Sequence, residues 1–584
     1  MMKRLIALLL SICCVLPLVA CGDDPNSGTG NGNKYNVAGP NKTEIMFANV
    51  NGGIGSVWLE EAAEEYARLN AETSFKAGKK GVYINIYKHL GESLQDTCET
   101  APYHIYTIEQ GRWVPYNTAN ANKVLDITEI VTDETREGGT LEDAIFESAK
   151  GNLKGNDGKY YGLPHYENYG GISYNRKIFN ELGCFIADPA DPTAELYPCP
   201  KYSTENIYLT TEDGILSAGP DGISGNEDDG MPKSIEELLV IMEFIKTGGI
   251  AQPIVMMGGE GGYADYTAAG IWGSLAGKDK MDNYFNSEGE IEICKLDANG
   301  NIILTNENLF PGIDYIKKPQ TETITLTAET GYLAQYMIEK YYMVSFLKII
   351  DKEGYWTEDA KNPSLSHYDA QMCLTFEGKG GVFKKTAMLV EATYWYNESE
   401  EAGCFTKLEA LTGMKESDLD VRMMSLPTNM YNEGAVARAS VLTDISLCYL
   451  AVNRNIQNNT EVKAAVFDFI KFLYSEEYLA KFVVTTGSMR AIKVSLTDAQ
   501  VDQMGNYYKR IWNLRDNEEG SNVVVCSGHT RAYYLNNRHL DFTLNDGEPL
   551  GGGSSIMQNL RNPSMLTVSD VMYKVDVNEL WVTE

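Results

Sequence analysis

The first folded stretch of the sequence alternates between strand and helix patterns, and this alternation restricts the fold more than any other feature. Residues 43–50 (TEIMFANV) form an apolar run that ends at a Gly-Gly turn. Residues 55–72 then place Leu59, Ala62, Tyr66 and Leu69 at helical spacing, with acidic residues opposite. Residues 81–90 (GVYINIYKHL) alternate as a strand. Strand, helix and strand in this order predict a parallel α/β sheet.

Helical patterns recur later in the chain. Ser234 and Glu237 have the spacing of a capping box, apolar residues follow, and Gly248 ends this helix. Residues 461–487 predict two consecutive helices, the second capped by Ser475. Between residues 214 and 230, glycine and acidic residues replace the apolar pattern, which predicts an inserted loop. No repeat typical of solenoids or propellers occurs.

Length and charge narrow the class of protein. A chain of 584 residues is too long for one core, so two or three domains are expected. Asp and Glu number 81 against 49 Lys and Arg, for a net charge of −32. Such an acidic surface disfavours nucleic acid and anionic lipid as partners and favours solubility. We therefore expect no nucleic-acid partner and a monomer.

The first 40 residues have the pattern of a lipoprotein leader. Two basic residues precede an apolar stretch of about a dozen residues, which is typical of a secretory signal and short for a bilayer span. The residues LVA before Cys21 match the bacterial lipobox, so we predict a signal peptide over 1–20 and lipidation of Cys21. Residues 21–40 are polar and glycine-rich and predict a flexible tether. The body is then extracytoplasmic and lipid-anchored to the bacterial cell membrane, unless Cys21 remains an ordinary thiol after a plain secretory signal.

The remaining cysteines are widely spaced and include no CxxC pair, which disfavours a zinc site. They are Cys98, Cys184, Cys199, Cys294, Cys373, Cys404, Cys448 and Cys526. An even number outside the cell permits disulfides, and Cys184 with Cys199 is the one candidate pair. The alternative is eight buried thiols.

Aromatic residues beside turns are the main candidate binding features. No H-E-x-x-H, G-x-S-x-G or Walker motif occurs, which is weak evidence against an enzyme. Sugars present apolar C–H faces and a rim of hydroxyls, so a sugar site needs aromatic platforms together with carboxylates and amides. The candidates are Glu167, Asn168, Tyr169, Tyr263, Tyr266, Trp272, Glu391, Tyr394 and Trp395. For each aromatic residue, core packing is the alternative.

Five segments, in order, give the chain a family resemblance. Residues 162–183 (GLPHYENYGGISYNRKIFNELG) resemble the L-P-x(n)-Y-N-K-x-x-F-x-x-x-G signature of the extracellular solute-binding proteins of family 1, the carbohydrate receptors of ABC importers. MPKSIEELLVIMEFIKTGG, FEGKGGVFKKTAMLVEATYWYNE, MMSLPTNMYNEG and residues 464–493 are similar to the family's later segments. With the lipobox, the resemblance covers nearly the whole chain.

The resemblance implies an α/β fold of two discontinuous lobes joined by crossover strands, like the periplasmic binding proteins, with ligand enclosed between the lobes. The first lobe would take residues 41–163 and 440–495, and the second 164–436 and 496–584, with an inserted loop region at 185–230. Three segments resemble the family's ligand-contacting ones: the turn with Glu109, Gln110 and Trp113, the crossover at 167–169, and the turn at 391–395. The chain departs from the family's pattern at the first and the last of these.

The loop GPDGISGNEDDG needs a separate interpretation. Asp221, Asn226, Asp228 and Asp229 supply hard oxygen ligands in a glycine-rich turn, which suits calcium. The EF-hand frame is missing, but the loop resembles calcium-like loops inserted in some lipoproteins of this family. A structural calcium ion and a solvated acidic turn are both compatible with these residues, and no other cofactor is expected.

Together these features predict a non-enzymatic receptor. It would capture a carbohydrate, an oligosaccharide in our interpretation, and deliver it to the permease subunits of an ABC transporter. Two alternatives stay open: a surface glycoside hydrolase or lyase, and the same fold with a non-sugar ligand such as a peptide.

Overall fold

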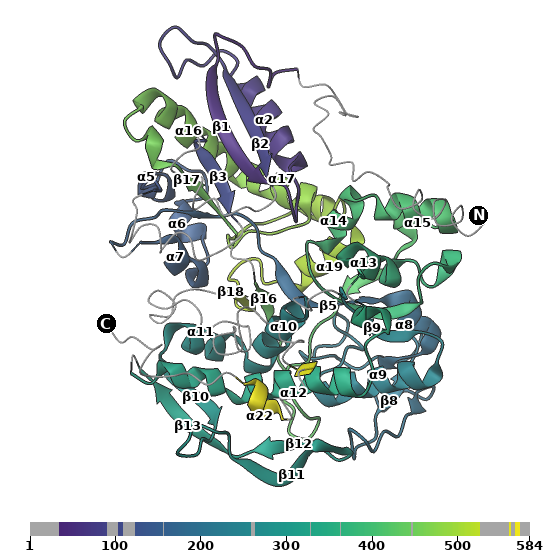
Figure 1. The fold of residues 1–584 in the computed structure, drawn as a ribbon. Coiled ribbons are helices and arrows are strands. Elements are labelled where there is room, and N and C mark those ends of the chain that lie inside the picture. Colours follow the sequence, from purple (N-terminus) through teal and green to yellow (C-terminus); the bar gives the residue numbers. More distant parts are fainter. Residues whose placement is uncertain are drawn as a thin grey trace, which may run out of the picture.

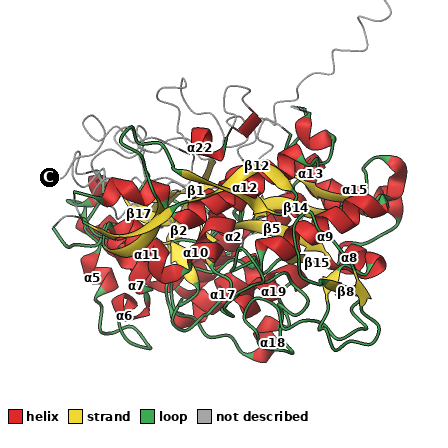
Figure 2. Cartoon of the chain, turned by 90° about the horizontal axis from the view of Figure 1, so that it is seen from below, coloured by secondary structure: helices red, strands yellow, loops and turns green. Residues whose placement is uncertain are grey.

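The computed structural model describes residues 34–89, 103–108, 123–155, 157–258, 263–327, 329–362, 364–445, 448–525, 560–561 and 567–572. Within them, the strands form two main sheets that lie in different halves of the molecule (Figure 1). Helices surround both sheets, as Figure 2 shows with helices in red and strands in yellow. We call the half that contains the first strand the first lobe and the other half the second lobe.

The first lobe is built on a five-stranded sheet with the order β2-β1-β3-β17-β4. Its strands are β1 (Thr43–Val50), β2 (Val82–His89), β3 (Ile105–Ile108), β4 (Leu163–Pro164) and β17 (Tyr449–Val452). Strand β1 runs parallel to β2 and β3, with Thr43 opposite Val82, whereas β17 is antiparallel to β3 and β4. The helices of this lobe are α2 (Val57–Leu69), α5 (Thr128–Val131), α6 (Leu141–Ala144), α7 (Glu147–Leu153), α16 (Thr460–Leu473) and α17 (Glu476–Thr486). The strand, helix and strand predicted for residues 43–90 are confirmed.

The second lobe contains a six-stranded sheet with the order β18-β16-β5-β14-β9, in which β15 also pairs with β5. Its strands are β5 (Tyr169–Asn175), β9 (Gln252–Val255), β14 (Thr386–Ala392), β15 (Val421–Met423), β16 (Leu442–Asp444) and β18 (Val523–Val525). The helices are α8 (Arg176–Leu182), α9 (Ile235–Gly248), α10 (Ala264–Ala276), α11 (Lys278–Asn286), α12 (Ile338–Lys352), α13 (His367–Thr375), α14 (Trp395–Glu401), α15 (Cys404–Thr412), α18 (Asp498–Val501), α19 (Asn506–Leu514) and α22 (Val568–Val571).

Local capping determines where two of the predicted helices begin. Ser234 accepts a hydrogen bond from the backbone N–H of Glu237 at the start of α9, as predicted. The Glu237 carboxylate, however, accepts from the backbone N–H of Lys233 and not from Ser234, so the reciprocal half of the capping box is shifted by one residue. Ser475 caps α17 by accepting from Tyr478 N, which confirms that prediction.

Smaller sheets extend the second lobe. They are β6 (Phe185–Ile186), β7 (Glu195–Leu196) and β8 (Tyr208–Thr210), the hairpin-like pair β11 (Leu304–Phe310) and β12 (Ile313–Pro319), and the pair β10 (Gly289–Cys294) and β13 (Thr321–Leu326). The region 185–230, expected as an inserted loop, therefore carries a three-stranded sheet at its start. Figure 1 shows β10 to β13 at the edge of the second lobe far from the first lobe.

The chain passes between the two lobes three times. It crosses from β4 to β5, returns from β16 to β17, and crosses again after α17 toward α19 and β18. The first lobe was expected to resume at residue 440. Strand β16, however, pairs with β5 and β18 of the second sheet, so the return crossing starts only after Asp444. The predicted fold class, two discontinuous α/β lobes joined by crossovers, is confirmed.

The described cysteines bear on the disulfide prediction. Cys184, Cys199, Cys294, Cys373, Cys404 and Cys448 are all buried free thiols. The candidate pair Cys184–Cys199 is therefore wrong in this structure, and the buried-thiol alternative holds for these six. Cys21, Cys98 and Cys526 lie outside the described residues. Among the described helices, none has the length and apolar character needed to cross a bilayer.

Candidate functional site

The three crossovers lie side by side and are joined by backbone hydrogen bonds. On the first crossover, the N–H of His165 donates to the carbonyl of Cys448 on the second (2.9 Å), and the N–H of Glu167 donates to Met489 on the third (2.8 Å). On the second crossover, the N–H of Ile445 donates to the carbonyl of Asn168 (3.0 Å). The predicted crossover at 167–169 is thus the central connection between the lobes.

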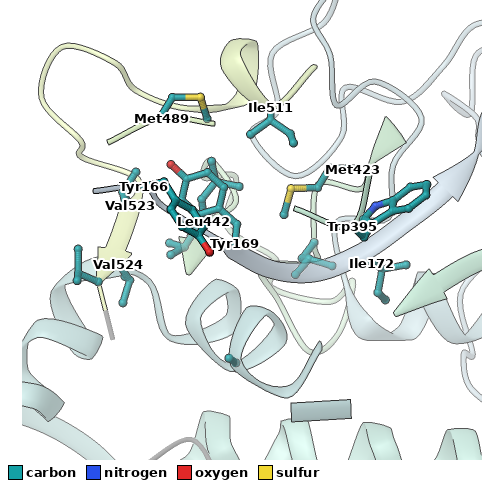
Figure 3. Packing of buried hydrophobic residues seen from close by; sticks show 14 of the residues in the cluster. Tyr166, Tyr169, Ile172, Trp395, Met423, Leu442, Met489, Ile511, Val523 and Val524 are labelled. Carbon is teal, nitrogen blue, oxygen red and sulfur yellow. The ribbon is translucent and has the colours of Figure 1, made fainter. Parts of the chain in front are cut away.

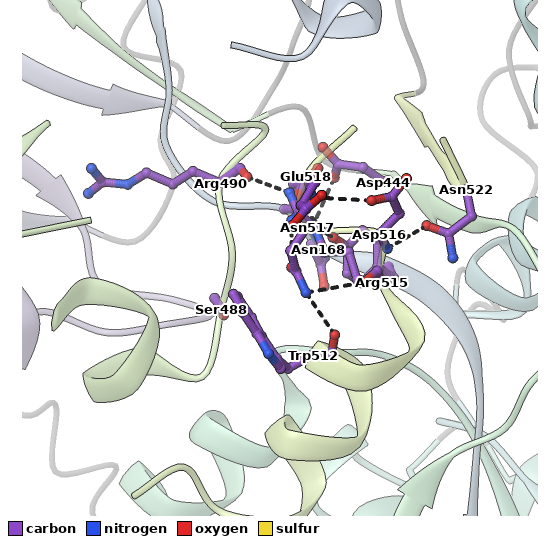
Figure 4. A network of polar contacts seen from close by, with 12 residues as sticks. Asn168, Asp444, Ser488, Arg490, Trp512, Arg515, Asp516, Asn517, Glu518 and Asn522 are labelled. Carbon is purple, nitrogen blue, oxygen red and sulfur yellow. Dashed lines mark hydrogen bonds and ion pairs between the residues drawn. The ribbon is translucent and has the colours of Figure 1, made fainter. Parts of the chain in front are cut away.

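A buried ion pair fixes this connection. Arg515 donates from Nε and Nη2 to Glu167 Oε2 at 2.9 and 2.7 Å, and the side chains of both residues are almost wholly excluded from solvent. Arg515 Nη2 also donates to the carbonyl of Arg490, and its Nε to the hydroxyl of Tyr169. Figure 4 shows Arg515 in this network with Asn168 and Asp444 nearby. Burial alone would lower the pKa of Arg515, but Glu167 and Tyr169 raise it above its ordinary value, so the guanidinium stays charged.

The same ion pair brings parts of both lobes together. The guanidinium of Arg515 lies 4.7 Å from the ring centre of Phe146 in the first lobe. Arg515 itself follows α19 in the second lobe. Asn168 also takes part, since its N–H donates to Asp444 Oδ1 at 3.0 Å. Glu167 and Asn168, predicted to contact a sugar, therefore lie at the junction and hold protein groups there; their contact with ligand stays a prediction.

The predicted turn at 391–395 lies against this crossover. The N–H of Tyr169 donates to Thr393 Oγ1 and the N–H of Thr393 donates back to the carbonyl of Tyr169, both at 3.1 Å. The N–H of Tyr394 points to Asn168 Oδ1 at 3.4 Å. The crossover and the turn, separated by more than 200 residues in sequence, therefore pack directly against each other in the second lobe.

Helix α10 approaches the same surface very closely. A Cβ on Gly170 would lie 2.4 Å from the carbonyl oxygen of Tyr266, so only glycine fits between β5 and the first turn of α10. This approach places the hydroxyl of Tyr266 3.0 Å from that of Tyr394. Tyr263, which precedes α10, packs its ring edge-on against Tyr266 at 4.9 Å. The structure thus brings together Tyr263, Tyr266 and Tyr394, which the sequence picked out in separate segments.

Three of the predicted aromatic residues lie in the core. Tyr169 is 1% exposed, and its hydroxyl donates to Glu167 and accepts from Arg515. Trp272 is fully buried on α10, and the Lys340 ammonium lies 4.8 Å from its ring centre. Trp395 is fully buried and donates from Nε1 to Ser173 Oγ (3.1 Å) and to the hydroxyl of Tyr507 (2.9 Å). Figure 3 shows Trp395 close to Ile172 and Met423. For these three rings the structure fits the core-packing alternative.

Other predicted residues cannot be placed. Glu109, Gln110 and Trp113 lie outside the described residues, as does the lipidation residue Cys21. Their predicted roles stay predictions.

The acidic loop forms one wall of a separate cavity of about 780 Å³ in the second lobe. The loop is held by its own hydrogen bonds, from Asn226 Nδ2 to Asp221 Oδ2 and from the N–H of Gly225 to Asp229 Oδ2, both 2.7 Å. Asp228 is 4% exposed, and its Oδ1 accepts no hydrogen bond from the residues that the structure describes. Burial first, and then Asp221, raise the pKa of Asp228 to about 7.

A calcium ion in this loop would have to be coordinated in part by backbone and amide oxygens. Within the described part of the chain, no three acidic, histidine or cysteine side chains converge as a metal-binding group. Asp228 with its unpaired oxygen, the Asn226 amide and loop carbonyls remain as donors of the kind that calcium accepts. Calcium binding by Asp221, Asn226, Asp228 and Asp229 stays a prediction.

Several residues of the site were not found from the sequence. Arg515 and Asp444 lie in segments without a motif, and Arg490 lies in the segment 464–493 that resembles the family but was not selected as a site residue. His367 and Tyr368 open helix α13 beside Tyr263, and the capping box of Ser366 and Asp369 that starts this helix is a signal that could have found them.

No family model and no curated protein matches the chain. Among solved structures, it is similar to a chitin oligosaccharide binding protein at 16% identity and a TM-score of 0.48, covering 83% of this chain and 89% of that one. It is also similar to the solute-binding protein RafE in complex with raffinose, at 12% identity and a TM-score of 0.47 over 85% and 93% of the two chains. Maltose-bound MalE3 of T. maritima is similar at 13% identity and a TM-score of 0.45 over 82% and 88%. At such identities, no residue of this chain takes its role from these structures.

Proposed function

We propose that this chain is a binding protein that encloses a carbohydrate between its two lobes and delivers it to the permease of an ABC importer. One observation carries the proposal: tyrosines from separate segments gather on the second lobe beside the crossovers that join the two lobes. Half-buried tyrosine rings supply the flat apolar surfaces and hydroxyls that sugar rings require. A ligand that contacts both lobes favours the closed arrangement by its differential affinity.

The lipobox supports the cellular part of the proposal. A receptor lipidated at Cys21 and carried on the polar tether at 21–40 would stay near its transporter while remaining free to turn. This gives an extracytoplasmic, membrane-anchored monomer with a carbohydrate ligand and separate permease subunits as partners.

The test is a thermal-shift screen of the chain, begun after residue 21, against a glycan array and a peptide library. We expect a rise in melting temperature with one class of oligosaccharide, and a decrease in the radius of gyration by X-ray scattering with that glycan. Stabilisation by peptides alone would replace the carbohydrate with a peptide ligand. Release of shortened glycan products would identify a hydrolase or lyase instead.

A further inference from the structure

A group of aromatic side chains covers one face of the second lobe beside the crossovers. We call it the tyrosine face, formed by Tyr263, Tyr266, His367, Tyr368 and Tyr394. Tyr266 packs edge-on against Tyr263 (4.9 Å) and Tyr394 (6.5 Å), and Tyr263 stacks on His367 (6.1 Å). All five side chains are partly exposed. Tyr266, His367 and Tyr368 lie in the first turns of α10 and α13, and Tyr263 and Tyr394 are the residues before α10 and α14, so the starts of three helices bring these rings together.

A buried carboxylate lies next to this face. Glu391, near the end of β14, is 3% exposed. Its oxygens accept from Gln371 Nε2 (3.2 Å) and from the N–H of Ala392 (3.1 Å). Ser399 donates to Gln371 Oε1 at 2.6 Å, which orients the Gln371 amide so that its nitrogen points to Glu391. The carboxylate is therefore held in place by neutral groups.

No cation compensates Glu391 within the described part of the chain. It forms no ion pair with Lys or Arg there, and the charge that acts on it is that of a second acid, Glu398. Burial first, and then Glu398, raise the pKa of Glu391 well above its ordinary value. The contrast with Glu167 is direct, because that equally buried carboxylate is paired with Arg515.

These two features favour the same ligand chemistry. A buried acid without a cation is unfavourable and gains when a positive charge comes close. Tyrosine rings carry a negative face that attracts cations, as the aromatic cages for ammonium ligands do. Gln371, which donates to Glu391, lies on α13 one turn after His367 and Tyr368, so rings and acid share one region. Burial first, and then nearby groups that include Glu391, raise the pKa of Tyr263 and of Tyr394.

We propose that the tyrosine face and Glu391 select a glycan that carries a protonated amine, that is, an amino sugar with a free amino group. The inference rests on the proposed carbohydrate function and names the class of sugar. The ammonium group would lie over the tyrosine rings on the side of Glu391, and the sugar hydroxyls would be left for the other groups of the site.

The test compares two tetrasaccharides with the same backbone, β-1,4-linked glucosamine and its fully N-acetylated form, by isothermal titration calorimetry at pH 6.5. We expect the free amine to bind about tenfold tighter or more. Its affinity should fall when sodium chloride rises from 50 to 500 mM, whereas that of any neutral glycan should not. Equal or tighter binding of the N-acetylated or another neutral glycan overturns the inference and leaves the carbohydrate function standing. Absence of binding by every glycan removes the carbohydrate function itself.

A pair of variants assigns the effect to Glu391. Glu391→Gln keeps the size and the hydrogen-bonding oxygen and removes the acid, so the preference for the amine should disappear. Glu409→Gln removes one acid from the exposed surface of α15 and should leave the preference unchanged. Because Glu391 is uncompensated, Glu391→Gln should melt at the same temperature as the natural chain or higher. An unchanged preference in folded Glu391→Gln overturns the assignment. Should this variant not fold, Tyr263→Leu, which removes one ring of the tyrosine face, is expected to weaken the preference for the amine, and an unchanged preference in that variant overturns the assignment.

Discussion

Replacement of Glu167 by Gln tests whether the ion pair at the crossovers holds the two lobes together. Arg515 donates two hydrogen bonds to Glu167 Oε2, and the exposed fractions of the two side chains are 0% and 1%. The variant keeps the shape of the side chain but leaves the guanidinium without a counter-charge in a buried site. Removal of one partner of a buried pair typically costs about 3–5 kcal/mol, and we expect a loss of about 3 kcal/mol in the free energy of unfolding.

The assay is equilibrium urea unfolding followed by tryptophan fluorescence. The matched control is Glu147→Gln, because Glu147 forms an ion pair of 2.8 Å with Lys150 while its own side chain is 89% exposed. That surface pair should contribute less than about 1 kcal/mol. A loss of under about 1 kcal/mol in Glu167→Gln would refute the structural role of the pair and would favour a role for Glu167 in contacting ligand.

Three further predictions concern the acidic loop and the close approach of α10 to β5. The pKa of Asp228 is about 7 in the folded chain against an ordinary 3.8, so the folded state holds this proton more tightly and stability falls as the pH rises from about 4 to 7. Asp228→Asn should remove this decline and be more stable than the natural chain at pH 8 by roughly 1–3 kcal/mol. Calcium added to the chelated natural chain should release heat and raise its melting temperature. A flat titration would remove the calcium prediction. Gly170→Ala would place a methyl group 2.4 Å from the carbonyl oxygen of Tyr266. This change should lower the free energy of unfolding by about 2 kcal/mol or more and should also reduce glycan affinity. The control is Gly248→Ala, whose added Cβ would lie in open space, and it should be neutral or slightly stabilising. Both variants are measured by urea unfolding, and equal effects of the two alanines would contradict the packing given for α10.

Local patterns in the sequence predicted much of the fold. The alternation and helical spacing of residues 43–90 are confirmed as β1, α2 and β2, and Ser475 begins α17 as its side chain predicts. These signals are local because a strand or a helix face is written in residues two to four positions apart. The order of strands in the second sheet could not be read in this way, since β5 pairs with segments more than 200 residues away.

The candidate site also combines residues that the sequence predicted with an arrangement that only the fold decides. The sequence selected Tyr263, Tyr266 and Tyr394 from separate segments, and the fold brings their rings together. The sequence could not distinguish these three tyrosines from Tyr169, Trp272 and Trp395, because the same residue types occur in a hydrophobic core and in a binding surface, and burial depends on which remote segments pack over them.

By itself, the sequence determined the acidic net charge and predicted an α/β protein with a lipoprotein leader and aromatic turns; the α/β class is confirmed, and the leader stays a prediction. The tertiary structure alone decided which acid is neutralised and which is not. Glu167 meets Arg515 from 348 positions away, whereas Glu391, near the end of β14, meets only neutral donors and another acid among the described residues. The reason is physical: the strength of a charge interaction depends on distance and burial, and both arise only when remote segments pack against one another.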